Sequence, residues 1–261
     1  MLCGHSHRRE ETIENGLLFA QYGCYNQYVG HIELDYNFET RSVTYTKKEA
    51  ITGYTINNEI QNIDDGIDSI INKYNSECEK AANEVVANNV NGSFASNEQL
   101  PNLMCKAIYE KAIDEGYDIT LAYCNNARAD LNYSTWTYAN LYQAFPFDNE
   151  IYIIEASYNE MVNEIGKYNY IYRSPQFDGT LTPSKKYLVA CLDYLMFHTN
   201  SSRYYDYFSD NNGKYVGVLE DNYRIILKDW LIEKGYVNGK QLNSGDYSSS
   251  LVDFSRSFTY N

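Results

Sequence analysis

The sequence predicts an α+β fold, on the evidence of two patterns. Over residues 17–54 the apolar residues form a short block or alternate with polar ones, whereas over residues 60–85 they recur at spacings of three and four. The first pattern is typical of strands and the second of an amphipathic helix. Further helical and strand patterns then follow without a strict strand–helix–strand rhythm, which favours α+β.

The first third of the chain is predicted to be rich in strands and to end in a long helix. LLFAQY at 17–22 indicates a buried strand, GHIELDYN at 30–37 alternates as a strand does, and residues 41–54 indicate a third strand with a turn. The helix, of roughly 25 residues by its periodicity, contains no proline and begins among Asn and Asp residues, which suit an N-cap. A helix of this length, placed between the strand patterns before it and the mixed patterns after it, predicts a connection between two domains.

The rest of the chain alternates between helical and strand patterns, with polar loops between them. Amphipathic or apolar patterns predict helices over 100–116, 136–145, 158–168 and 223–235, and strands over 117–124, 150–157 and 186–197. Residues 88–98 and 125–135 are polar loops, and Pro-Phe-Asp-Asn at 146–149 is a turn. The tail from about residue 236 is rich in Ser and Asn, which predicts loose packing.

The charge of the chain limits its partners. Asp and Glu outnumber Lys and Arg by 35 to 21, so the net charge is −14. Nucleic acid polymers and anionic membranes need clustered Lys and Arg, so neither is expected as the main partner, whereas a mononucleotide needs only a local pocket. No apolar run reaches the ~20 residues of a transmembrane helix, and the first ten residues contain no signal-peptide h-region. The six cysteines contain no Cys-x-x-Cys pair, which favours free thiols over metal ligands and leaves a disulfide possible.

Gly-His-Ser-His at residues 4–7 contains two of the four histidines, His5 and His7. Two imidazoles one residue apart are typical of metal ligands, although a surface loop is the alternative. A metal centre needs further ligands, and no Asp-x-His or Gly-Asn-His motif occurs in the chain.

Gly-His-Ser-His and the segments after it together resemble a known family. The residues that carry the resemblance are NGLLFAQYGCYNQYVGHIELDY, with a Gln21–Gly23 turn and a strand containing Tyr28 and Gly30, then LPNLMCKAI, NNARADL and PFDN. This order is similar to the end of the calcineurin-like metallophosphatase domain and the following C-terminal domain of the 5'-nucleotidase and 2',3'-cyclic phosphodiesterase family. The resemblance covers nearly the whole chain.

The resemblance implies a fold, three segments and a pair of metal ions. Residues 1–57 would be the terminal strands of a metallophosphatase domain, 58–90 a connecting helix, and 91–261 a nucleotide-binding domain with a mixed sheet and flanking helices. In the family, His5 and His7 would be the last ligands of two divalent metal ions, and the other ligands come from motifs upstream. Two-metal hydrolysis needs both ions about 3.5–4 Å apart, which two imidazoles cannot hold.

The resemblance also implies a site for the nucleoside. A base would lie between two aromatic rings, Phe147 of the Pro-Phe-Asp-Asn turn and Tyr194, with Asn149 bonded to the base edge. Asn200, six residues after Tyr194, would replace the Asp that accepts hydrogen bonds from the ribose. Arg128 closes the NNARADL loop and would bind near the phosphate.

The residues alone leave alternatives for the two rings and for the arginine. Phe147 and Tyr194 suit core packing as well, and Tyr204, Tyr205 or Tyr207 are other candidates for the second ring. Arg128 can instead pair with Asp130 or with another acidic residue on the surface. The family's Gly-Gly before this arginine maps to Asn125 and Asn126, which tolerate a left-handed backbone better than most residues.

We therefore expect the nucleotide-binding C-terminal portion of a metal-dependent 5'-nucleotidase, a secreted or periplasmic hydrolase by the resemblance. The chain alone is expected to be inactive, and the missing metallophosphatase half would be its partner. The alternatives are a nucleoside-binding domain without catalysis and a degenerate domain that acts as a scaffold.

Overall fold

We describe the chain from a computed structural model, in residues 2–25, 27–53, 55, 64–165, 170–197 and 215–261. The chain divides into two compact units, Met1–Tyr74 and Asn75–Asn261. Together they contain helices and strands in mixed order, so the predicted α+β class is confirmed. Of the helices that the structure describes, none combines the length and the apolar character needed to cross a bilayer.

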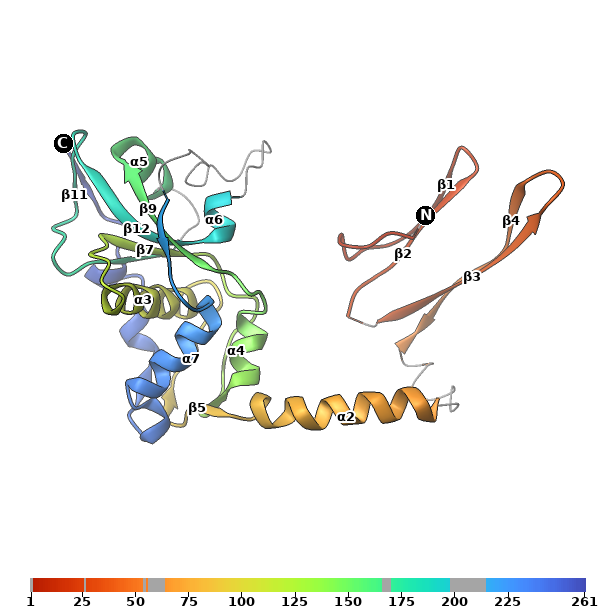
Figure 1. Cartoon of the computed structure of the whole chain (residues 1–261), viewed down its shortest axis with the longest axis horizontal. Coiled ribbons are helices and arrows are strands. Elements are labelled where there is room, and N and C mark those ends of the chain that lie inside the picture. The colour runs from red at the N-terminus through yellow and green to blue at the C-terminus, as the bar shows by residue number, and fades with distance from the viewer. Residues whose placement is uncertain (1, 26, 54, 56–63, 166–169, 198–214) are drawn as a thin grey trace. The chain divides into compact units, whose positions relative to one another are not determined.

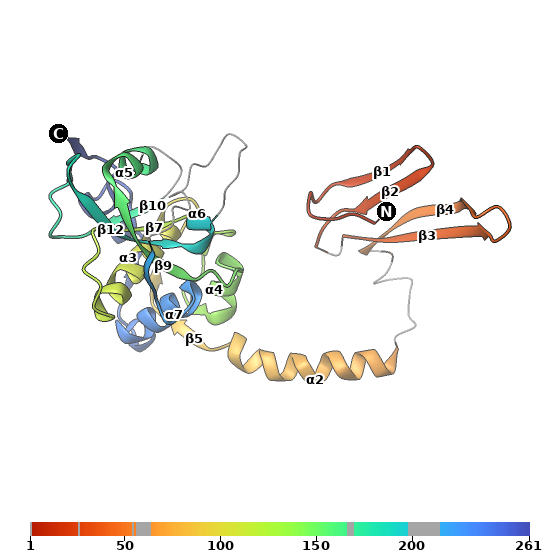
Figure 2. The ribbon, with the colours of Figure 1, turned by 45° about the horizontal axis from the view of Figure 1, so that its top comes forward.

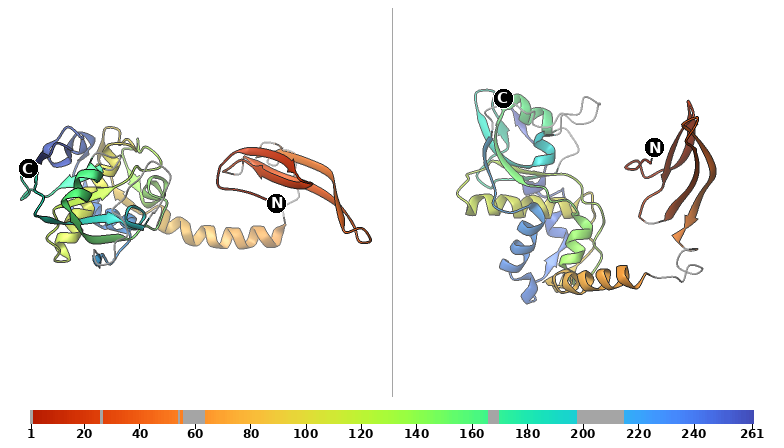
Figure 3. Two further views of the ribbon diagram at one scale, coloured as in Figure 1. Left: turned by 90° about the horizontal axis from the view of Figure 1, so that it is seen from above. Right: turned by 45° about the vertical axis from the view of Figure 1, so that its right-hand side comes forward.

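The first unit contains two antiparallel hairpins (Figure 3). β1 (Arg9–Glu14) pairs with β2 (Leu17–Tyr22), and β3 (Tyr28–Asn37) pairs with β4 (Ser42–Thr52). The last three strands were predicted from the sequence, but β1 was not, because its six residues are all exposed and lack an apolar face. Asn15 and Gly16 connect β1 to β2 with φ angles of 51° and 80°, as expected of a tight Asn-Gly hairpin turn.

Gly30 of β3 leaves room for the ring of Tyr22 to pack against the backbone of that strand. A Cβ at position 30 would overlap the ring of Tyr22, so no other residue fits there without a shift of that ring. The glycine therefore allows close approach of the Tyr22 ring to the strand backbone.

The connecting helix is shorter than predicted. α2 spans Asp65–Ala82, and Val85, placed in the helix by its spacing, begins β5 (Val85–Ala87) instead. Asp64 accepts hydrogen bonds from the backbone N–H groups of Gly66 (2.9 Å) and Ile67 (3.1 Å) and so caps the helix start. The prediction that an Asn or Asp residue caps the start of this helix is confirmed by Asp64. Residues 60–63, which the periodicity also placed in the helix, lie outside the described part of the chain.

A five-stranded mixed sheet forms the centre of the second unit (Figure 1). Its strand order is β10-β7-β12-β9-β13, in which only β7 and β12 are parallel. The strand bounds are Leu121–Cys124 for β7, Ile151–Ser157 for β9, Tyr170–Arg173 for β10, Lys186–Leu192 for β12 and Tyr215–Val218 for β13. β7 and β12 are buried at nearly every residue, which explains their continuous apolar sequences.

Helices cover this sheet, as the resemblance implied. α3 (Gln99–Asp114) packs on β7 and β10, and α7 (Tyr223–Glu233) packs on α3 (Figure 1). α5 (Tyr158–Ile165) lies against β9 and β12 (Figure 2). α4 (Tyr138–Ala144) follows the short strand β8 (Trp136–Thr137), so the predicted helix over 136–145 begins two residues late.

Two further predictions about the second unit are wrong. The strand predicted over 186–197 ends at Leu192, and α6 (Asp193–Phe197) takes its place, because a polar Asp interrupts the apolar run.

The tail after residue 236 is packed, not loose: it contains short 3₁₀ turns and the strands β14 (Leu242–Asn243) and β15 (Thr259–Tyr260). Its aromatic and apolar residues are buried in the core and hold it there; these are Tyr236, Leu242, Tyr247 and Phe254.

Candidate nucleoside-binding site

A pocket of about 280 Å³ lies where β7 and β12 end. Asn125 follows β7, and Asp193 follows β12, and these two strands are parallel. Their carboxyl ends therefore meet at one edge of the sheet, which is the edge where open sheets commonly bind ligands. The residues that line the pocket are Asn125, Arg128, Phe147, Asp148, Asn149, Asp193 and Tyr194. Four of the five substrate-binding residues predicted from sequence are among them.

The turn that presents Phe147 is fixed by a buried arginine. Arg224, 5% exposed, donates hydrogen bonds from Nη1 to the carbonyl oxygens of Phe145 (2.9 Å) and Phe147 (2.8 Å). Its Nη2 donates to Asp148 (2.5 Å), and its Nε donates to the Tyr138 hydroxyl (3.0 Å). One guanidinium thus holds the backbone on both sides of Pro146.

Arg224 itself is placed by the start of α7. Asn222 is the N-cap, and its side chain accepts hydrogen bonds from the backbone N–H groups of Arg224 (3.2 Å) and Ile225 (3.1 Å). A cation in the first turn opposes the helix dipole, so the position is unfavourable for helix stability on its own. The contacts with the turn compensate for this cost.

Phe147 and Tyr194 are exposed rings, not core residues. Their exposed fractions are 48% and 39%, which contradicts the alternative that they pack in the core. The Arg128 guanidinium lies over the Phe147 ring, with 5.0 Å between Cζ and the ring centroid, a cation–π distance. Within the described part of the chain Arg128 forms no ion pair, and Asp130, its alternative partner, accepts from Ser96 N instead (2.7 Å).

The loop that carries Arg128 holds its position without left-handed residues. Neither Asn125 nor Asn126 has a positive φ, so the interpretation that these residues preserve a glycine-like turn is wrong. The backbone N–H of Arg128 donates to Ala144 O (2.7 Å), and Leu131 bridges to Phe94. The first bond fixes the loop against the end of α4, and the bridge fixes it against the segment before α3.

Asp193 lines the pocket although no sequence pattern points to it. Its Oδ1 accepts hydrogen bonds from Asn149 Nδ2 (2.5 Å) and from the backbone N–H of Tyr194 (2.6 Å). Family spacing predicts the ribose acceptor six positions after Tyr194, at Asn200. Asn200 and the alternative rings Tyr204, Tyr205 and Tyr207 lie outside the described residues.

Comparisons with known proteins agree with this architecture. No protein-family model matches the chain, and a search of curated proteins finds no match either. Among solved structures, a protein described as a 5'-nucleotidase from Staphylococcus aureus, in complex with alpha-ketoglutarate, is 14% identical with a TM-score of 0.58 over 88% of this chain and 52% of its own. A 5'-nucleotidase precursor from Thermus thermophilus is 14% identical, with a TM-score of 0.54 over 93% of this chain and 55% of its own. The fold is that of 5'-nucleotidases. A third 5'-nucleotidase, from Candida albicans, is 11% identical with a TM-score of 0.52 over 89% of this chain and 56% of its own.

The chain spans about half the length of these 5'-nucleotidase structures. The likeness confirms at the level of fold what the residues indicated: strands of one domain, a connecting helix, and a mixed sheet with flanking helices. Since the identities are low, it concerns the fold and leaves the roles of individual residues as predictions.

His5 and His7 lie on an exposed loop of the 5'-nucleotidase fold, with φ angles of 76° and 60°. The buried Gln21 holds this loop by donating from Nε2 to Ser6 Oγ and to Arg8 O, both at 2.8 Å. The described residues include no cluster of three or more His, Cys, Asp or Glu side chains that suits a metal ion. Two exposed imidazoles do not fit a two-ion centre by themselves, so no reaction step is derived from them.

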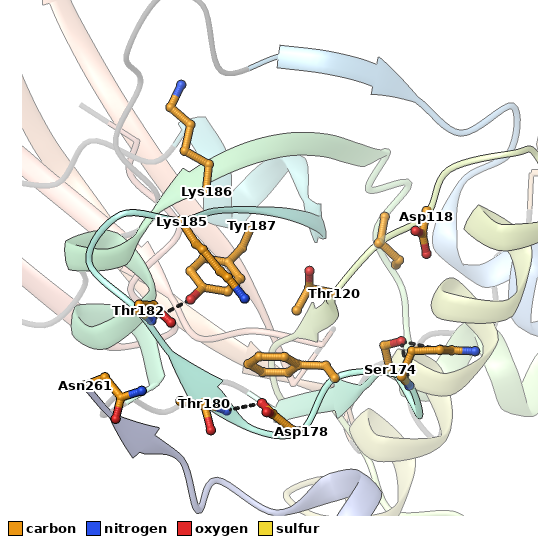
Figure 4. A pocket seen from close by; sticks show the side chains of 13 residues that line it. Asp118, Thr120, Ser174, Asp178, Thr180, Thr182, Lys185, Lys186, Tyr187 and Asn261 are labelled. Atoms are coloured by element: carbon orange, nitrogen blue, oxygen red, sulfur yellow. Dashed lines mark hydrogen bonds between the residues drawn. The ribbon is translucent and has the colours of Figure 1, made fainter.

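A second, more polar pocket of about 530 Å³ lies at the opposite ends of β7 and β12 (Figure 4). Several of its polar groups already have partners in the protein: Tyr187 Oη accepts from Thr182 N and Asp178 from Thr180 N, both at 2.7 Å. Lys186 pairs with Glu155 at 2.5 Å. These contacts shape the neighbouring loop, and none of the predicted site residues lies there.

Proposed function

We propose that this chain is the nucleoside-binding portion of a 5'-nucleotidase-type phosphoesterase. The observation that supports the proposal most directly is the position of Arg128, Phe147, Asn149 and Tyr194. They come from three separate segments and line one pocket at the edge of the sheet. The 5'-nucleotidase fold adds support that is independent of these residues.

The chemistry of the pocket suits a nucleoside. Exposed aromatic rings offer apolar faces on which a base stacks, a contact worth about 1–3 kcal/mol for each base. Arg128 offers a planar cation with several donors, which suits a phosphate group attached to the sugar. The volume of about 280 Å³ is near the lower limit of small-molecule sites, about 300 Å³. The pocket therefore suits a base and part of its sugar.

Hydrolysis requires more than this chain's described residues supply. In a complete two-metal enzyme the ions would activate a hydroxide and neutralise phosphoryl oxygens. In this proposal His5 and His7 contribute two ligands, and a metallophosphatase half, as partner or as additional chain, contributes the rest. We expect no detectable metal-dependent AMP hydrolysis by the purified 261-residue chain. Hydrolysis that depends on added divalent metal would contradict that expectation.

The binding function is tested by calorimetric titration of the purified chain with adenosine and guanosine. We expect heat from at least one of them and a loss of affinity of about 10-fold or more for Phe147→Ala, from the lost stacking contact. Phe38→Ala is the matched control, because Phe38 is also an exposed phenylalanine, at 85%, and belongs to the other unit. No binding at millimolar nucleoside would refute the proposal and favour a scaffold role.

The proposed location is the cell exterior or the periplasm. The support is indirect: the similar Thermus thermophilus protein is described as a precursor, a term used for proteins that are processed. Fractionation of the source cells, with detection by an antibody against the chain, tests this location.

A further inference from the structure

The pocket presents two hydrogen-bond acceptors that have no donor among the described residues. Asp193 Oδ1 accepts two hydrogen bonds, whereas its Oδ2 accepts none from that part of the chain. Since a carboxylate only accepts, the Asn149 atom that faces it must be the NH₂ group. The Asn149 amide is therefore oriented by Asp193, and its Oδ1, which receives no hydrogen bond from a described residue, remains an acceptor at the pocket.

The other charged groups of the pocket contact residues other than Asp193. Asp148 pairs with the buried Arg224, and Arg128 lies over the Phe147 ring. No cation among the described residues forms an ion pair with Asp193. The polar edge of the pocket thus combines one carboxylate oxygen and one amide oxygen, and it needs donors from a ligand.

We propose that the Asn149–Asp193 pair recognises the base edge and makes the site selective for guanine nucleosides. The inference rests on the proposed nucleoside-binding function and extends it to the identity of the base. Guanine carries two adjacent donors on its Watson–Crick edge, N1–H and the N2 amino group, and these match two acceptors.

The other bases match these acceptors less well. Adenine and cytosine each place a ring nitrogen acceptor beside their amino group, so a lone pair would face Asp193. Uracil and hypoxanthine offer a single N–H donor on this edge. An unpaired polar group at a binding site reduces affinity strongly, and hydrogen bonds to a charged partner are the stronger class. We expect guanosine to bind about 10-fold or more tightly than adenosine, and inosine to bind about 10-fold more weakly than guanosine.

The test compares nucleosides by calorimetry on the 261-residue chain and on Asp193→Asn. This variant replaces one carboxylate oxygen by an amide NH₂ and keeps the size of the side chain, so the guanosine-to-adenosine affinity ratio should fall to near one. Glu150→Gln is the matched control: it removes the same charge from a residue close in sequence that does not line the pocket. In the control we expect the ratio of the unmodified chain.

A series of ligands on the unmodified chain provides a second measurement that does not depend on the folding of a variant. 1-Methylguanosine lacks the N1–H donor, and its affinity should be lower than that of guanosine by about 10-fold. Equal binding of guanosine, 1-methylguanosine and adenosine would overturn the inference and leave nucleoside binding intact. Failure of every nucleoside to bind would overturn the proposed function and the inference with it.

Discussion

Arg224 is expected to control both the stability of the second unit and its affinity for nucleosides. Arg224→Met is the informative change, because methionine retains most of the aliphatic stem and removes every donor. The guanidinium contacts three residues of the Pro-Phe-Asp-Asn region and a hydroxyl of α4. All four contacts are lost together in the variant.

The structure lets the cost be estimated bond by bond. The hydrogen bond to Phe145 O is buried, and a buried acceptor left unpaired costs about 1–3 kcal/mol. The bond to Phe147 O is partly buried and is worth about 1 kcal/mol. The ion pair with Asp148 adds about 0–1 kcal/mol, since that carboxylate is 76% exposed. The hydrogen bond to the Tyr138 hydroxyl is partly buried and is worth about 1 kcal/mol. The free energy of unfolding should therefore fall by about 4 kcal/mol.

The assay is urea denaturation followed by tryptophan fluorescence. Both tryptophans, Trp136 and Trp230, belong to the second unit, so the signal reports the part that contains the site. Calorimetry on the folded variant should show nucleoside affinity reduced by about 10-fold, since the ring of Phe147 is no longer fixed. A variant with an unfolding free energy within about 0.5 kcal/mol of the parent and with unchanged affinity would refute the role given to Arg224.

Three further outcomes are expected. Tyr194→Ala should weaken nucleoside binding by about 10-fold and leave the urea midpoint unchanged, because the ring is 39% exposed; a shifted midpoint with normal affinity would indicate a core role. Asn222→Ala should lower the unfolding free energy by about 1 kcal/mol through loss of the α7 N-cap, and Asn222→Asp should restore it. Burial raises the pKa of Tyr172 to about 12, so the unfolded chain, with a tyrosine pKa of about 10, releases its proton first. The unfolding free energy should then fall from about pH 10 to pH 12, and Tyr172→Phe should reduce that slope; an unchanged slope would contradict the assignment.

The helices and strands could be predicted where the apolar residues of a segment form one clear pattern. β2, β3 and β4, and the helices α3 and α7, are found close to their predicted bounds. The apolar residues of β2 form a short continuous block, and those of the other elements follow a period of two or of three to four. The exposed β1 gives no such signal, and it forms through the Asn15–Gly16 turn and pairing with β2. The tail was misjudged because its few large residues, such as Tyr247 and Phe254, are separated by polar ones but all reach the core.

The candidate site could be predicted only for residues that belong to a recognisable local sequence motif. Phe147 and Asn149 lie in a short turn with a distinctive sequence, and Arg128 closes a polar loop between two predicted elements. Arg224 and Asp193 have no comparable signal. In sequence Arg224 resembles a surface residue of a terminal helix, and only the structure shows that it is buried against residues 138–148.

Asp193 is an acceptor in the pocket to which family spacing does not point. Spacing predicts the ribose acceptor at Asn200, which lies outside the described residues. The structure adds a carboxylate one residue before Tyr194, at the end of the parallel strand β12. An acceptor at that strand end is aimed by the sheet and by its hydrogen bonds to Asn149 and Tyr194, and needs no glycine-rich loop. Because the sheet edge fixes Asp193 and the turn held by Arg224 fixes Asn149, both groups that face the base are set by packed elements. Selectivity for the base is therefore expected to survive changes in the loop after α6 and to be lost with Asp193.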